Sequence, residues 1–132
     1  MADSMKPKVL QVGSVVYFLS KGRIHKSTIK YVLGLYAVTM EPCFHVNGYD
    51  NVFLANSIYD SAVRLASTIG KLVNNHVSFS SDHESAFFID STNRVFKAAK
   101  WYLEEQKIEH FESLNALREY LLKNIVDDTK IE

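Results

Sequence analysis

Cysteine, net charge and long apolar runs are all scarce in this sequence. Cys43 is its single cysteine, which excludes an internal disulfide framework and any zinc site built on cysteine pairs. Free cysteine is usually a small buried hydrophobe, so we expect a structural role for Cys43. No segment approaches the ~20 apolar residues that a membrane span requires, and the first residues lack the apolar stretch of a secretory signal. We therefore expect a cytoplasmic protein that makes no membrane contact.

Motifs that carry catalytic chemistry are also missing. The chain has no glycine-rich phosphate loop and no serine in a nucleophile elbow. Glu104 and Glu105 would point about 100° apart on a helix, so they do not face each other as a pair of catalytic carboxylates. A site assembled from distant residues leaves no trace in sequence spacing. The sequence therefore predicts a protein that is not an enzyme and names no catalytic residue.

Histidines are present but scattered. His25, His45, His76, His83 and His110 fall on different predicted elements, and no pair has the i, i+4 spacing that presents two ligands on one helix face. Residues 82–84 place Asp, His and Glu consecutively, yet adjacent side chains on a turn rarely converge on one ion. A solvated loop is the simpler interpretation. The sequence predicts no metal site and no cofactor.

The chain nevertheless has enough apolar material for a proper core. Its 132 residues are 47% hydrophobic and 12% aromatic, and domains commonly contain roughly 100–150 residues. No low-complexity tract argues for disorder. We expect one domain over residues 1–132, with a barrel-like sheet at 12–56, a helical α+β extension at 57–126 and a frayed tail at 127–132.

The net charge is zero, but charge is unevenly distributed along the chain. Residues 1–40 contain six cations and one acid, whereas residues 82–132 contain eleven acids and seven bases. Such asymmetry is typical of a surface that meets a polyanion, or of two ends that meet each other or a neighbouring subunit. A homo-oligomer is therefore one of the alternatives.

Residues 15–54 have the pattern of short strands joined by tight turns. Residues 15–19 form a continuous apolar run rich in β-branched and aromatic side chains, which is typical of a strand covered on both faces. Gly22 and the Asn47-Gly48 pair are turn signals, because glycine adopts the positive φ of a tight hairpin. These features predict five antiparallel strands that close into a small barrel, which also removes exposed edges.

The segments "VGSVVYFLSKGRIHKSTIKYV", "LYAVTM" and "VFLANS" together resemble the opening of small barrels of the Src-homology, Tudor and KOW kind. The resemblance covers residues 12–57, and short accessory proteins of phage genomes begin in a similar way. It implies a binding fold and names no catalytic residue. For a phage accessory protein, the implied partner is a host protein whose activity it modulates.

Beyond residue 57 the apolar period changes from two to 3.6, which predicts helices. Ser57 is the expected cap of an amphipathic helix. Residues 76–80 and 86–90 have the pattern of a short hairpin, and Ser91 and Ser113 open two C-terminal helices. The predicted fold is α+β: a five-stranded antiparallel small barrel followed by an amphipathic helix, a short hairpin and two C-terminal helices.

The basic hairpin at residues 21–30 carries the strongest functional signal. Its cations stand on or beside one turn, and nearby tyrosines offer stacking surfaces. Cations fix phosphates while aromatic faces stack bases, which is how small barrels hold single strands. The alternative is a solvated edge strand whose tyrosines fill the core. The candidate binding residues are Lys21, Arg23, His25, Lys26, Lys30, Tyr31 and Tyr36.

Three functions are compatible with these patterns. The first is a non-enzymatic interaction protein, of the phage accessory kind, that binds and modulates a host protein. The second is a protein that uses the basic hairpin to bind nucleic acid, or an anionic nucleotide held between subunits. The zero net charge disfavours non-specific coating of DNA. Enzymatic activity ranks last.

Overall fold

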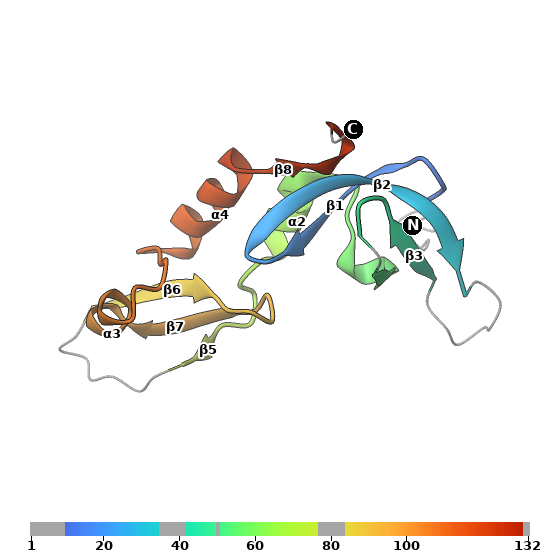
Figure 1. The fold of residues 1–132 in the computed structure, drawn as a ribbon. Coiled ribbons are helices and arrows are strands. Elements are labelled where there is room, and N and C mark those ends of the chain that lie inside the picture. Colours follow the sequence, from blue (N-terminus) through green and yellow to red (C-terminus); the bar gives the residue numbers. More distant parts are fainter. Residues whose placement is uncertain (1–9, 35–41, 50, 77–83, 131–132) are drawn as a thin grey trace, which may run out of the picture.

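The computed structural model describes residues 10–34, 42–49, 51–76 and 84–130. Within these ranges it has two β-sheets and three α-helices, an α+β fold as the sequence predicts. Figure 1 shows the larger sheet at one end of the molecule and the smaller sheet at the other, with α2 (Ala62–Thr68) and α4 (Leu114–Lys123) between them. No described helix is both long enough and apolar enough to cross a bilayer.

The larger sheet is a curled half-barrel. Its antiparallel strands follow in the order β1 (Val15–Ser20), β2 (Arg23–Leu33), β3 (Cys43–Val46) and β4 (Val52–Leu54), and β8 (Val126–Asp127) pairs with β2 in parallel. The prediction of a closed, antiparallel five-stranded barrel is therefore wrong: the sheet stays open, and its fifth described strand comes from the C-terminal part of the chain. The strand expected at residues 35–40 lies outside the described residues.

Tight turns at glycine join these strands. Both central residues of the β1–β2 turn have positive φ, 53° at Lys21 and 72° at Gly22, which suits the twist of the flanking strands. Gly48 has a φ of 84°, and the Tyr49 amide donates to the Val46 carbonyl at 3.1 Å. The predicted Asn-Gly turn is therefore present between β3 and β4.

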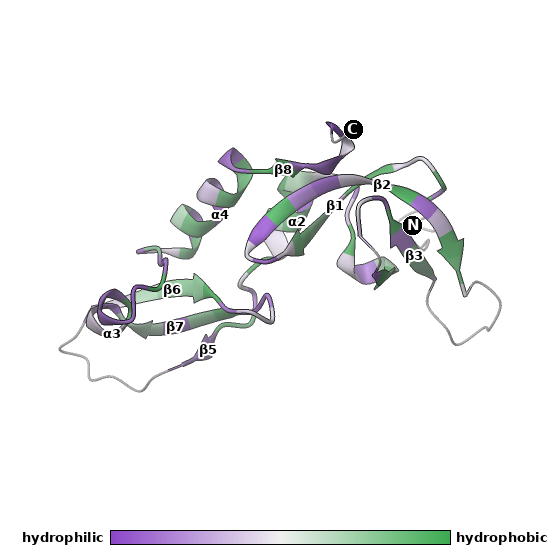
Figure 2. Ribbon diagram, viewed as in Figure 1, coloured by the Kyte–Doolittle hydropathy of each residue, from purple (hydrophilic) through white to green (hydrophobic). Residues whose placement is uncertain are grey.

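Successive side chains of a strand point to opposite faces of the sheet. In the β1–β2 hairpin both faces are buried. On one face Val16 and Phe18 belong to a core cluster inside the half-barrel, with Ile29, Phe44, Val46 and Ile58. On the other face Leu19 and Ile24 belong to a second cluster, formed with α2 and α4. Figure 2 shows separate hydrophobic and hydrophilic bands along β2. The hairpin is thus shared by two cores.

The smaller sheet has the order β5 (Asn74–Asn75), β7 (Val95–Ala99) and β6 (Ser85–Ile89). The strand predicted at 86–90 is present as β6, but its antiparallel partner is β7 rather than residues 76–80. Residues 77–80 of that predicted partner lie outside the described residues. Leu103, from α3 (Lys100–Glu105), completes a small core with Ala86, Phe88 and Ala98.

The helix predicted to begin at Ser91 is replaced by a turn and a strand, because Asp90 captures the amides that follow it. Its Oδ1 atom accepts hydrogen bonds from the Thr92 amide at 3.0 Å and the Arg94 amide at 3.2 Å. The chain therefore turns back instead of winding into a helix. Asn93 completes the turn with a φ of 64°. Helical structure resumes only at α3, after β7.

Serine side chains cap the other two described helices. Ser113 caps α4 as predicted: its hydroxyl accepts a hydrogen bond from the amide three residues on, at 3.0 Å. The amphipathic helix α2 is shorter than predicted, because it begins after Ser61 and not after Ser57. Ser57 instead ends the 3₁₀ turn η1 (Ala55–Ser57). α2 ends at Thr68.

The C-terminal residues are docked on the half-barrel. β8 is followed by the 3₁₀ turn η2 (Asp128–Lys130), and Asp128 is only 8% exposed. The prediction of a frayed tail is therefore wrong for residues 127–130. Sequence periodicity misses this docking because the partner of Asp128, His25, is 103 residues away.

Gly70 combines a positive φ with a close approach to α4. Its φ is 83°, and a Cβ atom there would lie 2.7 Å from Leu114 Cδ2. We predict that G70A lowers the free energy of unfolding by about 1–3 kcal/mol. G22A should have a smaller effect, because Gly22 has a φ of 72° but a Cβ there would meet nothing within 4 Å. Urea denaturation measures both losses.

The control for this prediction removes the obstructing side chain. In an L114A background the extra destabilisation of G70A over G22A should disappear, because only the φ strain is left at both positions. If the difference between the two variants is the same with and without Leu114, the close approach has no energetic weight.

Candidate functional site

Two of the predicted hairpin cations, Lys21 and Lys30, are exposed, but they lie far apart along the hairpin. Lys21 stands in the β1–β2 turn, and Lys30 follows seven residues after the start of β2, near the strand's other end. Both side chains are solvent-exposed. Because they are toward opposite ends of one strand, they do not form a continuous cationic surface.

Arg23 is committed to contacts inside the molecule. Its Nη1 atom donates to the Gly22 carbonyl at 2.9 Å, and its Nη2 atom donates to the Tyr120 hydroxyl at 2.9 Å and to the Glu109 carboxylate at 3.3 Å. The guanidinium also lies 4.9 Å from the centre of the Tyr120 ring, within cation–π range. Arg23 thus ties the hairpin to α4 and to the segment that precedes it.

His25 belongs to a buried polar network. Its Nδ1 atom lies 2.9 Å from Asp128 Oδ2 and 2.6 Å from the Tyr49 hydroxyl, and its ring stacks on Phe18 with 5.4 Å between centroids. Burial, and then the nearby Asp128 charge, raise the pKa of Tyr49. His25 is 7% exposed, so it faces the protein interior and not a solvent-side partner.

The remaining predicted residues are dispersed. Lys26 Nζ lies 3.8 Å from Asp127 Oδ2. Tyr31 is 46% exposed and stacks on the His45 ring, with 4.7 Å between centroids. Tyr36 lies outside the described residues. The six described members of the predicted set therefore do not converge on one site.

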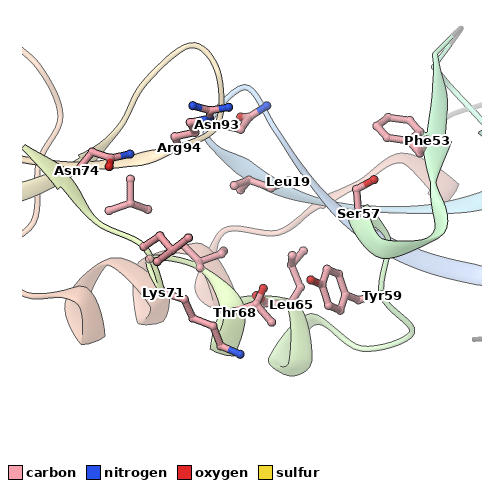
Figure 3. A pocket seen from close by; sticks show the side chains of 14 residues that line it. Leu19, Phe53, Ser57, Tyr59, Leu65, Thr68, Lys71, Asn74, Asn93 and Arg94 are labelled. Atoms are coloured by element: carbon pink, nitrogen blue, oxygen red, sulfur yellow. The ribbon is translucent and has the colours of Figure 1, made fainter. Parts of the chain in front are cut away.

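A different site is formed where the half-barrel, α2 and the β6–β7 turn meet. A cleft of about 780 Å³ lies at this junction, and Figure 3 shows the side chains that line it. Its apolar lining consists of Leu19, Phe53, Tyr59, Leu65, Ile69, Leu72 and Val95, and its polar lining of Ser57, Thr68, Lys71, Asn74, Asn93 and Arg94, next to Gly70. A concave, mainly apolar surface with a few polar groups is typical of a binding site.

The β6–β7 turn positions one wall of the cleft. Asn93 and Arg94 lie side by side on this wall in Figure 3, with Lys71 on the other side. Asn93 Oδ1 accepts a hydrogen bond from the Gly22 amide at 3.2 Å, which ties this turn to the β1–β2 turn. The β6–β7 turn, which carries Asn93 and Arg94, is therefore fixed by its contact with the β1–β2 turn.

Asp90 stabilises the same turn from within. Burial opposes ionisation of its carboxyl group, but hydrogen bonds from Thr92 and the Arg94 amide, together with the Arg94 charge, outweigh burial and lower the pKa of Asp90. The carboxylate is therefore ionised near neutral pH and supports the loop that displays Asn93 and Arg94.

The cleft carries two cations, of which Arg94 interacts electrostatically with Asp90 of its own turn. Neither Lys71 nor Arg94 forms a salt bridge with a described residue, and no carboxylate is among the lining residues. Leu72, at the cleft, is 87% exposed. The arrangement can therefore hold an anionic group close to an apolar one.

A smaller cleft of about 360 Å³ lies on the other side of the β1–β2 turn. Its lining includes two cations, Lys21 and Arg23, but also two acids, Asp90 and Glu109. Arg23 and Glu109 already pair with each other. Since its charges are balanced, this cleft selects for an anion less well than the larger one.

The half-barrel has an exposed apolar face on strands β2, β3 and β4. Strand register aligns Tyr31 with His45 and Val52, and the next row on the same face aligns Leu33, Cys43 and Leu54. Tyr31, Leu33, Val52 and Leu54 are each between 39% and 51% exposed. An apolar face of this kind marks a contact surface more often than isolated apolar residues do.

Sequence reasoning placed the functional signal on the hairpin and missed Lys71 and Arg94. Lys71 and Arg94 fall on two different predicted helices. The sequence therefore gives no reason to expect the two side chains in one cleft. The missed signal is the run Asp90-Ser91-Thr92-Asn93, whose residue types favour turns.

Neither a metal group nor a known relative defines the site. In the described part of the chain, no three His, Cys, Asp or Glu residues are grouped so that they could hold a metal ion. Comparisons with protein-family models, with curated proteins and with solved structures find no match to this chain. Function is therefore inferred from the geometry and chemistry of the surface.

We predict that D90A loosens the β6–β7 turn and lowers the free energy of unfolding by about 1–2 kcal/mol, because its donors lose their acceptor. D90N keeps an acceptor oxygen and should lose less. Because folding lowers the pKa of Asp90 from 3.8, its contribution is present above that value and is lost as pH falls through the folded pKa. Urea denaturation from about pH 6 to 3 should show this loss in the wild type but not in D90N. The same acid dependence in both chains contradicts the assignment.

We predict that Y49F lowers the free energy of unfolding by about 1 kcal/mol at neutral pH, because the hydrogen bond to His25 is lost. Folding raises the pKa of Tyr49 above 10.0, so its contribution is complete below that value and is lost as pH rises through the folded pKa. The difference between the wild type and Y49F should therefore narrow above about pH 10. A difference that stays constant up to the alkaline limit of urea denaturation speaks against this role.

Proposed function

We propose that this protein is a non-enzymatic protein-binding module whose cleft receives an acidic, partly apolar segment of a partner protein. The observation that carries the proposal is the lining of the 780 Å³ cleft: an apolar floor, Lys71 and Arg94 on facing walls, and no carboxylate among the lining residues. An acidic partner complements this charge, and apolar side chains complement the floor.

Each part of the cleft has a distinct task in this proposal. The floor around Leu19 and Leu65 takes apolar anchor side chains, which supply most of the affinity because they leave water. Arg94 presents a planar fork that pairs with a carboxylate in two parallel hydrogen bonds. Asn93 and Asn74 offer amide groups that suit the backbone of an extended segment.

Nucleic acid fits this cleft less well than a peptide does. Single strands are held by exposed aromatic faces together with a row of cations along the backbone. The two aromatic lining residues, Phe53 and Tyr59, are both half-buried, and the Phe53 ring packs on Phe18 with 4.8 Å between centroids. The remaining floor is aliphatic, which favours peptide side chains over bases.

The exposed apolar face independently favours a protein partner. Phe53 of β4 lines the cleft, while its neighbours Val52 and Leu54 point to the opposite side of the strand. β4 therefore borders both the cleft and the apolar face. A partner that wraps this edge strand would bury both surfaces.

Several expectations from the sequence stay predictions. A host protein as the partner, a role as a phage accessory protein, a cytoplasmic location and a homo-oligomer are all compatible with the proposed module. The nucleotide or nucleic-acid alternative at residues 21–30 is weakened by the contacts that already occupy Arg23 and Lys26.

Charge reversal of the cleft tests the proposal. Peptides selected from a displayed random library on the wild-type chain should be rich in Asp and Glu combined with Leu or Phe. Their affinity, measured by fluorescence anisotropy, should fall about tenfold or more in K71E/R94E, because two attractive charges become repulsive. Both residues are exposed, so stability should change by only about 0.5 kcal/mol.

The matched control is K21E/K30E, which makes the same change in net charge on exposed residues outside the cleft. This variant should retain peptide affinity to within about twofold. Equal losses in both variants would assign binding to net charge or to the hairpin. Binding of labelled oligothymidylate that falls linearly in log salt concentration and is abolished by K71E/R94E would replace the peptide with a nucleic acid.

A further inference from the structure

The free edge of β2 is occupied by the chain's own C-terminal segment. On one side β2 pairs with β1 along residues 23–28, while on the other side β3 begins to pair only at Ile29. The stretch of edge before Ile29 would be open, and β8 fills it by pairing Val126 with His25 and Asp127 with Lys26 in parallel. Figure 1 shows β8 lying along β2 after the chain leaves α4.

A pair of aspartates fixes this segment in register. Asp128 Oδ2 lies 2.9 Å from His25 Nδ1, and the side chains of both residues are 9% exposed. The Tyr49 hydroxyl approaches the same nitrogen at 2.6 Å, which places a third polar group around Asp128. This is a pocket built for one carboxylate, and residues from β2 and from the β3–β4 turn form it.

The second aspartate meets a cation. Asp127 Oδ2 lies 3.8 Å from Lys26 Nζ, while its Oδ1 atom accepts a hydrogen bond from the Thr129 amide at 3.1 Å. Val126, in contrast, is 37% exposed and adds little apolar anchoring. The segment is therefore held by polar contacts and two strand pairs, the type of attachment that opens at low free energy.

We propose that this edge of β2 is a docking site for an extended acidic segment of a partner protein, and that residues 126–130 occupy it as an internal competitor. The partner segment adds to β2 as a parallel strand. Its carboxylate replaces that of Asp128 beside His25 and Tyr49, and the acidic residue before it meets Lys26. None of these residues lines the cleft, so this site is separate from the one proposed above.

A separate protein suits this edge better than a second copy of the chain. Only Asn124 and Ile125 separate α4 from β8, so the chain's own segment is held close to its site at a high effective concentration. Ile125 also packs against the core cluster beneath α4, which restrains the hinge that an exchange between copies would need. A partner segment has only to displace β8, whereas exchange between copies also requires β8 to reach the edge of another chain.

The test uses the full-length chain and a labelled peptide with the sequence of residues 124–130, NIVDDTK. In D127N/D128N the internal competitor is weakened, so fluorescence anisotropy should show the peptide binding at least about tenfold more tightly than to the wild type. A peptide with Asn in place of both aspartates should not bind. H25Q/D127N/D128N should not bind the native peptide, although its internal segment is weakened equally.

A second measurement covers the case in which D127N/D128N does not fold. Hydrogen exchange of the wild-type chain should be faster for amides 126–130 than for the β1–β2 hairpin, and excess peptide should speed the former further by displacing the segment. The proposal is overturned if the peptide binds no folded variant, or if amides 126–130 exchange as slowly as the hairpin. It is also overturned if light scattering shows dimers that the peptide does not dissociate, which would assign the edge to a second copy.

Discussion

The arrangement of this molecule depends on one constraint: the β1–β2 hairpin has apolar side chains on both faces, and both faces must be buried. Phe18 faces the inside of the half-barrel, whereas Leu19 and Ile24 face α2 and α4. A small closed barrel covers only its inner face, so this hairpin needs a second layer. The helices supply that layer, and β8 takes the edge of β2 where a further barrel strand would pair. The half-barrel stays open, and the apolar face formed by Tyr31, Leu33, Val52 and Leu54 is left exposed.

The same constraint creates the cleft. Once α2 and α4 cover the outer face of the hairpin, the small sheet follows, because β6 contacts α4 and its turn reaches the β1–β2 turn through Asn93. The cleft lies where these elements meet, and its lining includes Leu19 of β1, Leu65 of α2 and Arg94 of the β6–β7 turn. Arg94 enters it because Asp90 holds the turn in which Arg94 lies. The position of the Arg94 charge thus follows from the packing of the β6–β7 turn against the β1–β2 hairpin.

Local signals in the sequence were sufficient for some elements and misleading for others. The Lys21-Gly22 turn, the Ser113 cap and strand β6 follow from short-range preferences, so they could be predicted. The apolar stripe of a helix would also fit the spacing of Val95, Ala98 and Ala99. The chain forms a strand there because Asp90 accepts hydrogen bonds from the amides of the preceding turn. Residues 127–130 look like a frayed polar tail until His25, distant in sequence, provides a partner. The internal contacts of Arg23 could not be predicted for the same reason, because its partners are on segments near residues 109 and 120.

Salt bridges distinguish the cations of the hairpin from those of the cleft. The described chain uses many of its ionic groups as internal ties: Arg23 holds α4, His25 and Lys26 hold the C-terminal residues, and Lys100 pairs with Glu112. In a chain whose formal net charge is zero, Lys71 and Arg94 are exposed cations that border an apolar cleft without a salt bridge to a described residue. We propose that an anionic partner pairs with them there and gains a charge-assisted hydrogen bond. Arg23 and Lys26, in contrast, already form salt bridges, which favours the cleft over the hairpin as the proposed binding surface.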